Sequence, residues 1–147
     1  MGLRIVLLAA AAALTTGAAA QAATIQFDEA VARVTVIPEA RNDVQVEIVR
    51  PNRELPLRVS RAGDRTVISG DLGTRLRDCN GRGDERKVRI RGLGSVDFRD
   101  MPQVVVRAPR DVRIETDGAV FGAIGRSASL ELKSAGCGGW TVADVAG

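Results

Sequence analysis

The chain has 147 residues, of which 27% are charged, and its formal net charge is +3. Histidine and tyrosine are absent, which excludes histidine-based catalytic triads, histidine-ligated metal sites and acid–base chemistry by histidine. Basic and acidic residues nearly balance, 21 against 18, so the overall charge is not that of a dedicated nucleic-acid binder.

The first 22 residues contain the three parts of an export signal. Arg4 is the positively charged start, residues 5–14 are an apolar run, and Ala18-x-Ala20 or Ala20-x-Ala22 is a small-residue cleavage site. The apolar run is too short for a membrane-spanning helix, which needs about 20 residues, and no later segment is apolar for that long. We therefore expect a signal peptide over residues 1–22 and an exported, not membrane-spanning protein of the periplasm, cell surface or medium.

The mature chain, residues 23–147, is expected to form a single β domain whose first part, residues 23–103, is rich in hairpins. Alternating β-branched residues and turn residues predict these elements. Residues 70–85 hold four glycines and no apolar period, so they predict a long loop. The predicted strands cover 24–27, 31–37 and 44–49, with the last two paired as an antiparallel hairpin, then 55–59 and 66–68 around a Gly-Asp turn, and 87–91.

Residues 112–147 contain one short pattern twice. Val112-x-Ile114-x-Thr116-x-Gly118 returns 18 positions later as Leu130-x-Leu132-x-Ser134-x-Gly136, and alternating runs follow at 120–124 and 140–145. A unit of strand, glycine corner and strand buries its apolar row only by stacking on a neighbouring unit. The pattern therefore predicts parallel β-solenoid coils over 104–147, with glycines where the backbone needs a positive φ.

The spacing Val104-x-Val106-x-x-Pro109-x-x-Val112-x-Ile114-x-x-x-Gly118, followed by these coils, resembles the bacterial auto-transporter adhesin or head GIN domains. The resemblance implies a right-handed parallel β-helix, a cell-envelope location and no catalytic residues. The expected fold is therefore all-β, with N-terminal antiparallel hairpins leading into the first coils of a right-handed parallel β-solenoid. Such domains usually continue through several more coils, whereas this sequence ends at Gly147 after about two. We expect either a piece of a longer solenoid or a last coil covered by a partner.

Two cysteines in an exported chain predict a disulfide between Cys79 and Cys137. The bridge would fasten the loop at 70–85 to the coils and would stabilise the fold by about 4 kcal/mol in the chain-entropy model. Two small buried thiols are the alternative.

The predicted loop carries two candidate binding features. Its hard oxygen ligands could hold calcium, although Arg82 stands at the fifth position counted from Asp78, which departs from the EF-hand pattern; a solvated loop is the alternative. The calcium candidates are Asp78, Asn80, Asp84 and Glu85.

The segment 75–91 has a local excess of four positive charges and could bind an anionic partner. No aromatic residue is interleaved to stack on bases, so we expect no nucleic acid; a solvated strand face is the alternative. This predicted basic patch consists of Arg75, Arg77, Arg82, Arg86, Lys87, Arg89 and Arg91.

The leading functional hypothesis is an exported, non-enzymatic β-solenoid, adhesin-like or with a structural or binding role in the envelope. We expect no cofactor, a partner that is an envelope protein or polysaccharide, and self-association through the open solenoid end. The alternative is a polysaccharide-binding or polysaccharide-cleaving β-helix module, by analogy of fold alone. That alternative would need carboxylates that converge on one face, for which the candidates are Glu115, Asp117, Glu131 and Asp144.

Overall fold

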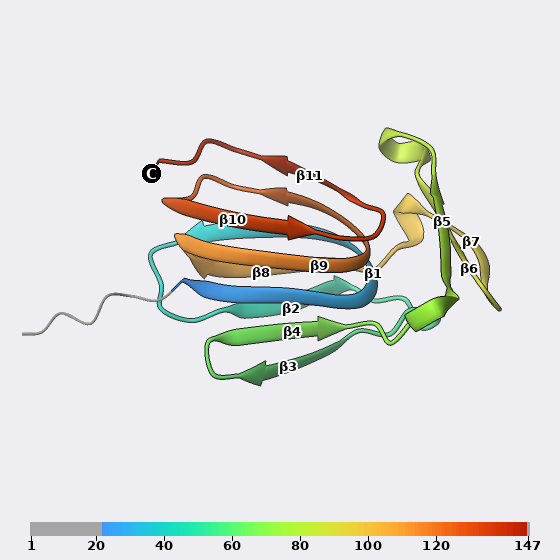
Figure 1. Cartoon of the computed structure of the whole chain (residues 1–147), viewed down its shortest axis with the longest axis horizontal. Helices are drawn as coiled ribbons and strands as arrows, with labels where there is room; N and C mark the ends of the chain where they lie inside the picture. The colour runs from blue at the N-terminus through green and yellow to red at the C-terminus, as the bar shows by residue number, and fades with distance from the viewer. Residues whose placement is uncertain (1–21, 147) are drawn as a thin grey trace, which may run out of the picture.

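The computed structural model describes residues 22–146, and the predicted signal peptide lies outside them except for its last residue. Within this range the chain forms strands and three short 3-10 turns but no α-helix, which confirms the all-β prediction (Figure 1). The elements in chain order are β1 (Ala23–Glu39), β2 (Gln45–Arg50), β3 (Arg58–Ala62), β4 (Arg65–Ser69), η1 (Gly73–Arg75), β5 (Leu76–Asn80), η2 (Gly83–Glu85), β6 (Lys87–Ile90), β7 (Gly94–Asp97), η3 (Phe98–Asp100), β8 (Gln103–Pro109), β9 (Asp111–Ile124), β10 (Ser129–Ser134) and β11 (Gly139–Val142).

Eight strands form one large sheet that curls into a half-barrel around the long strands β1 and β9 (Figure 1). The first half of β1 pairs in parallel with β4 and with the first half of β9. Its second half pairs in parallel with β8 and with the second half of β9. Each long strand therefore contributes to both walls of the half-barrel, and the apolar side chains between the walls form the main core.

The 18-residue repeat places its two copies side by side. Val112 pairs with Leu130 and Thr116 with Ser134 in a parallel ladder between β9 and β10. The second half of β9 pairs in parallel with β11. The large sheet as a whole is mixed, however, because β2 pairs antiparallel with β8, and β3 antiparallel with β4.

The hairpin predicted for residues 31–49 is wrong. Residues 31–37 and 44–49 do not form a hairpin, because β8 lies between β1 and β2: Val106 pairs with Val36 on one side and with Val46 on the other. The apolar row of β8 is fully buried at Val104 and Val106, so this distant strand fits the core better than the adjacent strand does. The hairpin of β3 and β4 is confirmed.

Residues 70–85 are not a structureless loop. They contain β5 between the two turns η1 and η2, and β5 pairs antiparallel with β6 in a second, three-stranded sheet completed by β7. This small sheet packs against the bend of the large sheet (Figure 1). The contact is a second apolar cluster, in which Val88, Ile90 and Val96 meet Ala119 and Phe121.

The bend of the long strands depends on glycine. Gly118 has φ +110°, and a Cβ atom there would lie 2.4 Å from the carbonyl oxygen of Ala30 in the layer beneath. Gly136 has φ +78°, and its Cβ would lie 2.3 Å from the oxygen of Gly118. The chain therefore bends at the same place in successive layers, where the backbones of the layers touch. Only glycine permits so close a contact together with a positive φ. The predicted role of these two glycines as corner residues is confirmed.

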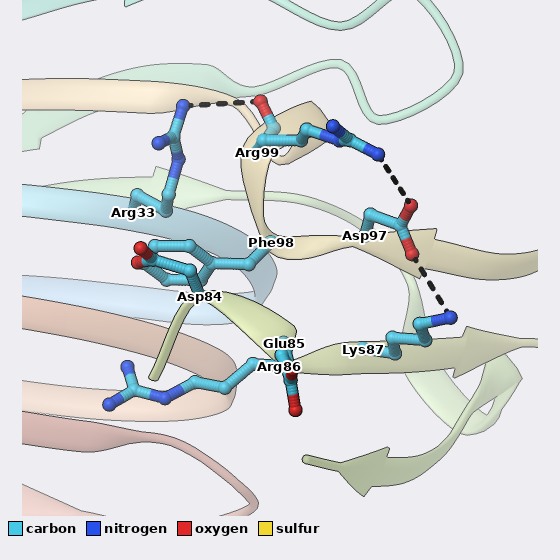
Figure 2. Close-up of a pocket in the computed structure, with 8 residues that line it drawn as sticks. All are labelled: Arg33, Asp84, Glu85, Arg86, Lys87, Asp97, Phe98 and Arg99. Carbon is cyan, nitrogen blue, oxygen red and sulfur yellow. Dashed lines mark hydrogen bonds and ion pairs between the residues drawn. The ribbon is translucent and has the colours of Figure 1, made fainter. Parts of the chain in front are cut away.

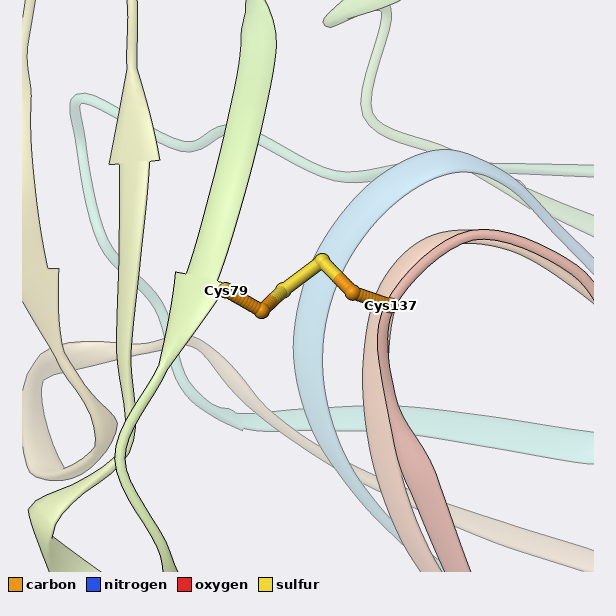
Figure 3. Close-up of a disulfide and its surroundings, with 2 residues drawn as sticks. All are labelled: Cys79 and Cys137. Atoms are coloured by element: carbon orange, nitrogen blue, oxygen red, sulfur yellow. A yellow bond between two sulfur atoms is a disulfide. The ribbon is translucent and has the colours of Figure 1, made fainter.

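Cys79 on β5 and Cys137 just after β10 are joined as a disulfide, with their Cα atoms 5.9 Å apart (Figure 3). The two residues are 58 positions apart in the sequence. The bridge connects the small sheet to the large sheet beside the glycine corner, which is the pairing that the sequence predicts. No described residue belongs to a helix long and apolar enough to cross a membrane.

We expect Gly118→Ala to destabilise the protein by about 2 kcal/mol or more, because the new methyl group collides with Ala30 and the left-handed φ is unfavourable for alanine. Gly139→Ala is the matched control, since a Cβ at Gly139 meets nothing within 4 Å. Urea unfolding of both variants measures the difference. Equal stability of the two variants would contradict the backbone-contact account of the corner.

Replacement of both cysteines by alanine should remove up to about 4 kcal/mol of stability, as expected for opening a long covalent loop. We expect limited proteolysis of this variant to cleave residues 70–85 before it cleaves β9 or β10, because the small sheet then depends on its apolar contact alone. Mass spectrometry of the fragments identifies the first cut. Simultaneous loss of both regions would instead mean that the bridge supports the whole fold.

Candidate functional site

A cleft of about 790 Å³ lies where β1 of the large sheet meets the small sheet and the turns η2 and η3. Its walls come from segments that are far apart in the sequence (Figure 2). We call it the corner cleft. Its lining residues are Arg33, Asp84, Glu85, Arg86, Lys87, Asp97, Phe98 and Arg99.

Backbone hydrogen bonds hold the two walls of the corner cleft. The amide of Arg33 donates to the carbonyl of Pro102 at 2.8 Å, and the amide of Phe98 donates to the carbonyl of Arg86 at 2.9 Å. Phe98 also meets Phe121 edge to face, with ring centroids 5.9 Å apart. Because Phe121 is the cross-strand neighbour of Arg33, the aromatic pair joins both walls beneath the cleft.

Two arginines pack against the Phe98 ring. The guanidinium carbon of Arg33 lies 5.2 Å from the ring centroid, and that of Arg86 lies 5.4 Å from it. Figure 2 shows the two guanidinium groups on different sides of the ring. Arg86 also lies 5.0 Å from the centroid of Phe121. Such cation–π contacts are worth about 0.5–2 kcal/mol each and leave the N–H groups of the guanidinium free to donate.

These arginines differ from the other half-buried arginines in their partners. Among residues 22–146, five arginines are half-buried: Arg33, Arg41, Arg65, Arg86 and Arg113. Three of them pair with carboxylates: Arg41 with Asp43 and Glu39, Arg65 with Glu115, and Arg113 with Glu131. The two in the corner cleft have no carboxylate within 4 Å among residues 22–146.

Arg33 illustrates the shortage of acceptors. Its Nη2 donates to the carbonyl oxygen of Arg99 at 3.3 Å, whereas its buried Nε has no hydrogen-bond partner in the described part of the chain. A cation removed from water without a counter-charge is unfavourable unless a ligand or partner compensates it.

The rim of the cleft is partly self-compensated. Asp97 forms one ion pair with Lys87 at 3.6 Å and another with Arg99 at 3.8 Å. Asp84 and Glu85 are exposed and form no ion pair with any residue that the structure describes. Both side chains line the cleft. The cleft thus combines two arginines that have no carboxylate partner with two carboxylates that form no ion pair, among the described residues.

The members of the predicted basic patch differ in their contacts. Arg86 and Lys87 line the corner cleft, whereas Arg89 pairs with Asp78 at 2.8 Å. Arg75 donates through Nε to the carbonyl oxygen of Arg91. The remaining members, Arg77 and Arg82, are exposed.

The candidate calcium ligands are not brought together. Asp78 and Asn80 lie on β5, where Asp78 is engaged by Arg89, and Asp84 and Glu85 lie on η2. Across residues 22–146 no three Asp, Glu or Cys side chains gather as a metal-binding group.

The carboxylates proposed for polysaccharide chemistry are dispersed among basic partners. Glu115 pairs with Arg65 at 3.1 Å, and Asp144 with Arg126 at 3.7 Å. Glu131 pairs with Arg113 at 2.8 Å and with Lys133 at 3.2 Å. Hydrogen bonds from Lys133 and from Arg113 lower the pKa of Glu131. Asp117 is exposed at the corner.

Sequence reasoning missed four residues of the cleft: Arg33, Asp97, Phe98 and Arg99. Arg33 lies in an apolar strand pattern and Phe98 lies in a charged turn, 65 positions later. One local signal was available: Phe98 is an aromatic residue within the run Asp97-Phe98-Arg99-Asp100. The absence of aromatic residues from the segment 75–91 was therefore misleading, because the fold supplies one from outside that segment.

Comparisons with known proteins add little. No family model matches the sequence, and no curated protein matches it. The structure is similar to the crystal structure of a candidate cell adhesion protein from Clostridium sporogenes, with a TM-score of 0.37 and 8% sequence identity over 77% of this chain. The match covers 50% of that protein's chain.

We expect the stabilising effect of Glu131 to disappear in acid. A lowered carboxyl pKa contributes stability above the usual value of 4.5, and this contribution is lost as pH falls through the lowered pKa. Glu131→Gln should therefore melt below the wild-type protein at pH 6.5, and this gap should be smaller at an acidic pH well below 4.5. Thermal melts at both pH values measure the gap. Glu47→Gln is the control, since Glu47 has no ion pair among the described residues; a pH-independent gap for Glu131→Gln would contradict the ion-pair account.

Proposed function

We propose that this chain is an exported, non-enzymatic binding module of the cell envelope, adhesin-like in type, which holds an anionic partner in the corner cleft. The disulfide supports export, because such bridges persist in oxidising compartments. The sequence of residues 1–22, which lie almost wholly outside the described range, supports it as well.

The strand stack serves as the rigid support in this proposal. We interpret β1, β9 and the layer of β10 and β11 as coils of a right-handed parallel β-solenoid. The parallel registers and the glycine corner support this interpretation. Such a stack fixes the position of Arg33, which is a prerequisite for a site that binds without rearrangement.

The observation that carries the proposal is the lack of carboxylate partners for Arg33 and Arg86. The other three half-buried arginines have such partners, so the shortage is local to the cleft. Charge-assisted hydrogen bonds between guanidinium and carboxylate or phosphate are among the strongest in proteins. An anionic group of a partner would complete the pairing that the chain itself supplies elsewhere.

The open edge of the stack is a second contact surface in this proposal. Within residues 22–146, β10 and β11 pair with β9 alone, and Val142 beside this edge is 43% exposed. An unpaired strand edge can accept a further strand. A further coil, an envelope polypeptide or a second copy of the chain would add there.

A polysaccharide-binding or polysaccharide-cleaving module is the alternative. Asp84 favours it, since an exposed carboxylate that lines the same cleft as two arginines and an aromatic ring suits a hydroxylated anionic ligand. Cleavage would additionally require a proton donor at the bond to be broken, for which Asp84 and Glu85 are the available groups.

We expect the purified mature chain to bind carboxymethyl-dextran and not unmodified dextran in surface plasmon resonance at low salt. The double variant Arg33→Gln/Arg86→Gln should bind at least about tenfold more weakly, because it loses charge-assisted hydrogen bonds worth about 1.5–3 kcal/mol each. The control is Arg53→Gln/Arg61→Gln, which removes the same charge from exposed residues outside the cleft. An equal loss in both double variants would contradict binding in the cleft and indicate a diffuse charge effect.

A further inference from the structure

We propose that the ligand of the corner cleft is a run of acidic sugar units, of the uronic-acid type, within an envelope or host polysaccharide. This inference rests on the proposed function and names the chemical class of the partner. Carboxylates of neighbouring sugar units would bind the guanidinium groups of Arg33 and Arg86, which lie on different sides of the Phe98 ring (Figure 2). One or more sugar hydroxyl groups would donate to the Asp84 carboxylate.

The balance of charges in the cleft favours a ligand with a single negative charge per unit. Asp97 pairs with Lys87 at 3.6 Å and with Arg99 at 3.8 Å, so these three residues together keep a net charge of +1. The groups that remain are Arg33 and Arg86 against Asp84 and Glu85. A phosphate dianion or a polyphosphate would meet repulsion from the two carboxylates, because like charges at short range are unfavourable. A single carboxylate at each arginine brings less negative charge near Asp84 and Glu85 than a phosphate dianion does.

The presence of Asp84 favours a ligand that also donates hydrogen bonds. An ionised carboxylate only accepts hydrogen bonds, and Asp84 has no partner among residues 22–146. A simple carboxylate would leave it unsatisfied, whereas a sugar acid carries hydroxyl donors next to its carboxylate. Phe98 lies between the two guanidinium groups and keeps them apart in the cleft.

The size and rigidity of the cleft are consistent with a short saccharide. Its volume of about 790 Å³ falls in the range of about 300–1,000 Å³ that is typical of small-molecule sites. Arg33 is held by the strand stack, and Arg86 by its backbone contact with Phe98 in the region that the disulfide ties down. The two cations are therefore placed before the ligand arrives, which lowers the entropic cost of binding.

Isothermal titration with four probes tests the inference: a galacturonic acid trisaccharide, a neutral glucose trisaccharide, the tripeptide triglutamate and inorganic phosphate. The trigalacturonate and triglutamate both carry several carboxylates, but only the former carries sugar hydroxyls. We expect the trigalacturonate to bind the wild-type chain most tightly and the neutral trisaccharide to show no binding. Arg86→Gln should weaken trigalacturonate binding about tenfold or more, consistent with the loss of one charge-assisted hydrogen bond or two, and the control Arg61→Gln should leave it unchanged.

Asp84→Ala gives the decisive comparison. Removal of a negative charge strengthens binding of any anion by electrostatics alone, so this variant should bind triglutamate more tightly. It should bind trigalacturonate about threefold or more weakly, because the acceptor for the hydroxyl groups is lost. Asp84 is exposed on a short turn, and circular dichroism checks that the fold is retained.

The possible failures are distinguishable. If triglutamate or phosphate binds the wild-type chain as tightly as trigalacturonate, or if Asp84→Ala strengthens binding of both ligands, the sugar assignment is wrong while anion binding in the cleft stands. If none of the three anionic probes binds, and carboxymethyl-dextran is not retained either, the proposed function fails together with this inference.

Discussion

The close contact of backbone layers at the glycine corner is the constraint on which the rest of the structure depends. Ala30, Gly118 and Gly136 stack there with no room for a side chain on either glycine. Because the layers turn at the same place, the first halves of β1 and β9 form one wall and their second halves form the other. The apolar rows then face each other across the core. The same bend brings Arg33 and Phe121 to the outer surface just past the corner, as cross-strand neighbours.

The small sheet converts this outer surface into a cleft. The inner face of the small sheet packs against Val31, Ala119 and Phe121 of the large sheet. The disulfide adds a covalent connection next to this apolar contact. The turns η2 and η3 at the end of the small sheet are therefore held at a fixed position relative to β1. The cleft therefore forms only where the two sheets meet.

The half-buried arginines among the described residues differ in whether they pair with a carboxylate. On the outer face of the strand stack, Arg113 pairs with Glu131 across an 18-residue step, and Arg65 reaches Gln26 and Glu115. These contacts join neighbouring strands of the same sheet, so these arginines need no partner from outside the chain. Arg33 and Arg86 lie against aromatic rings, which stabilise a cation without neutralising it. That difference, and not the number of basic residues, is the reason why we propose the cleft as a binding site.

The sequence by itself determined the all-β class, the pairing of the two cysteines and the parallel register of residues 112–116 on residues 130–134, because each follows from composition or from a local repeat. Glycine at 118 and 136 could be predicted as a corner for the same reason. Tertiary structure decided what depends on distant segments. β8 displaced β2 from β1 because its buried valines fit the core, and residues 76–80 became a strand only by pairing with β6. Arg86 belonged to a visible basic run, but Arg33 and Phe98 are 65 positions apart, and only the folded bend and the anchored small sheet bring them together.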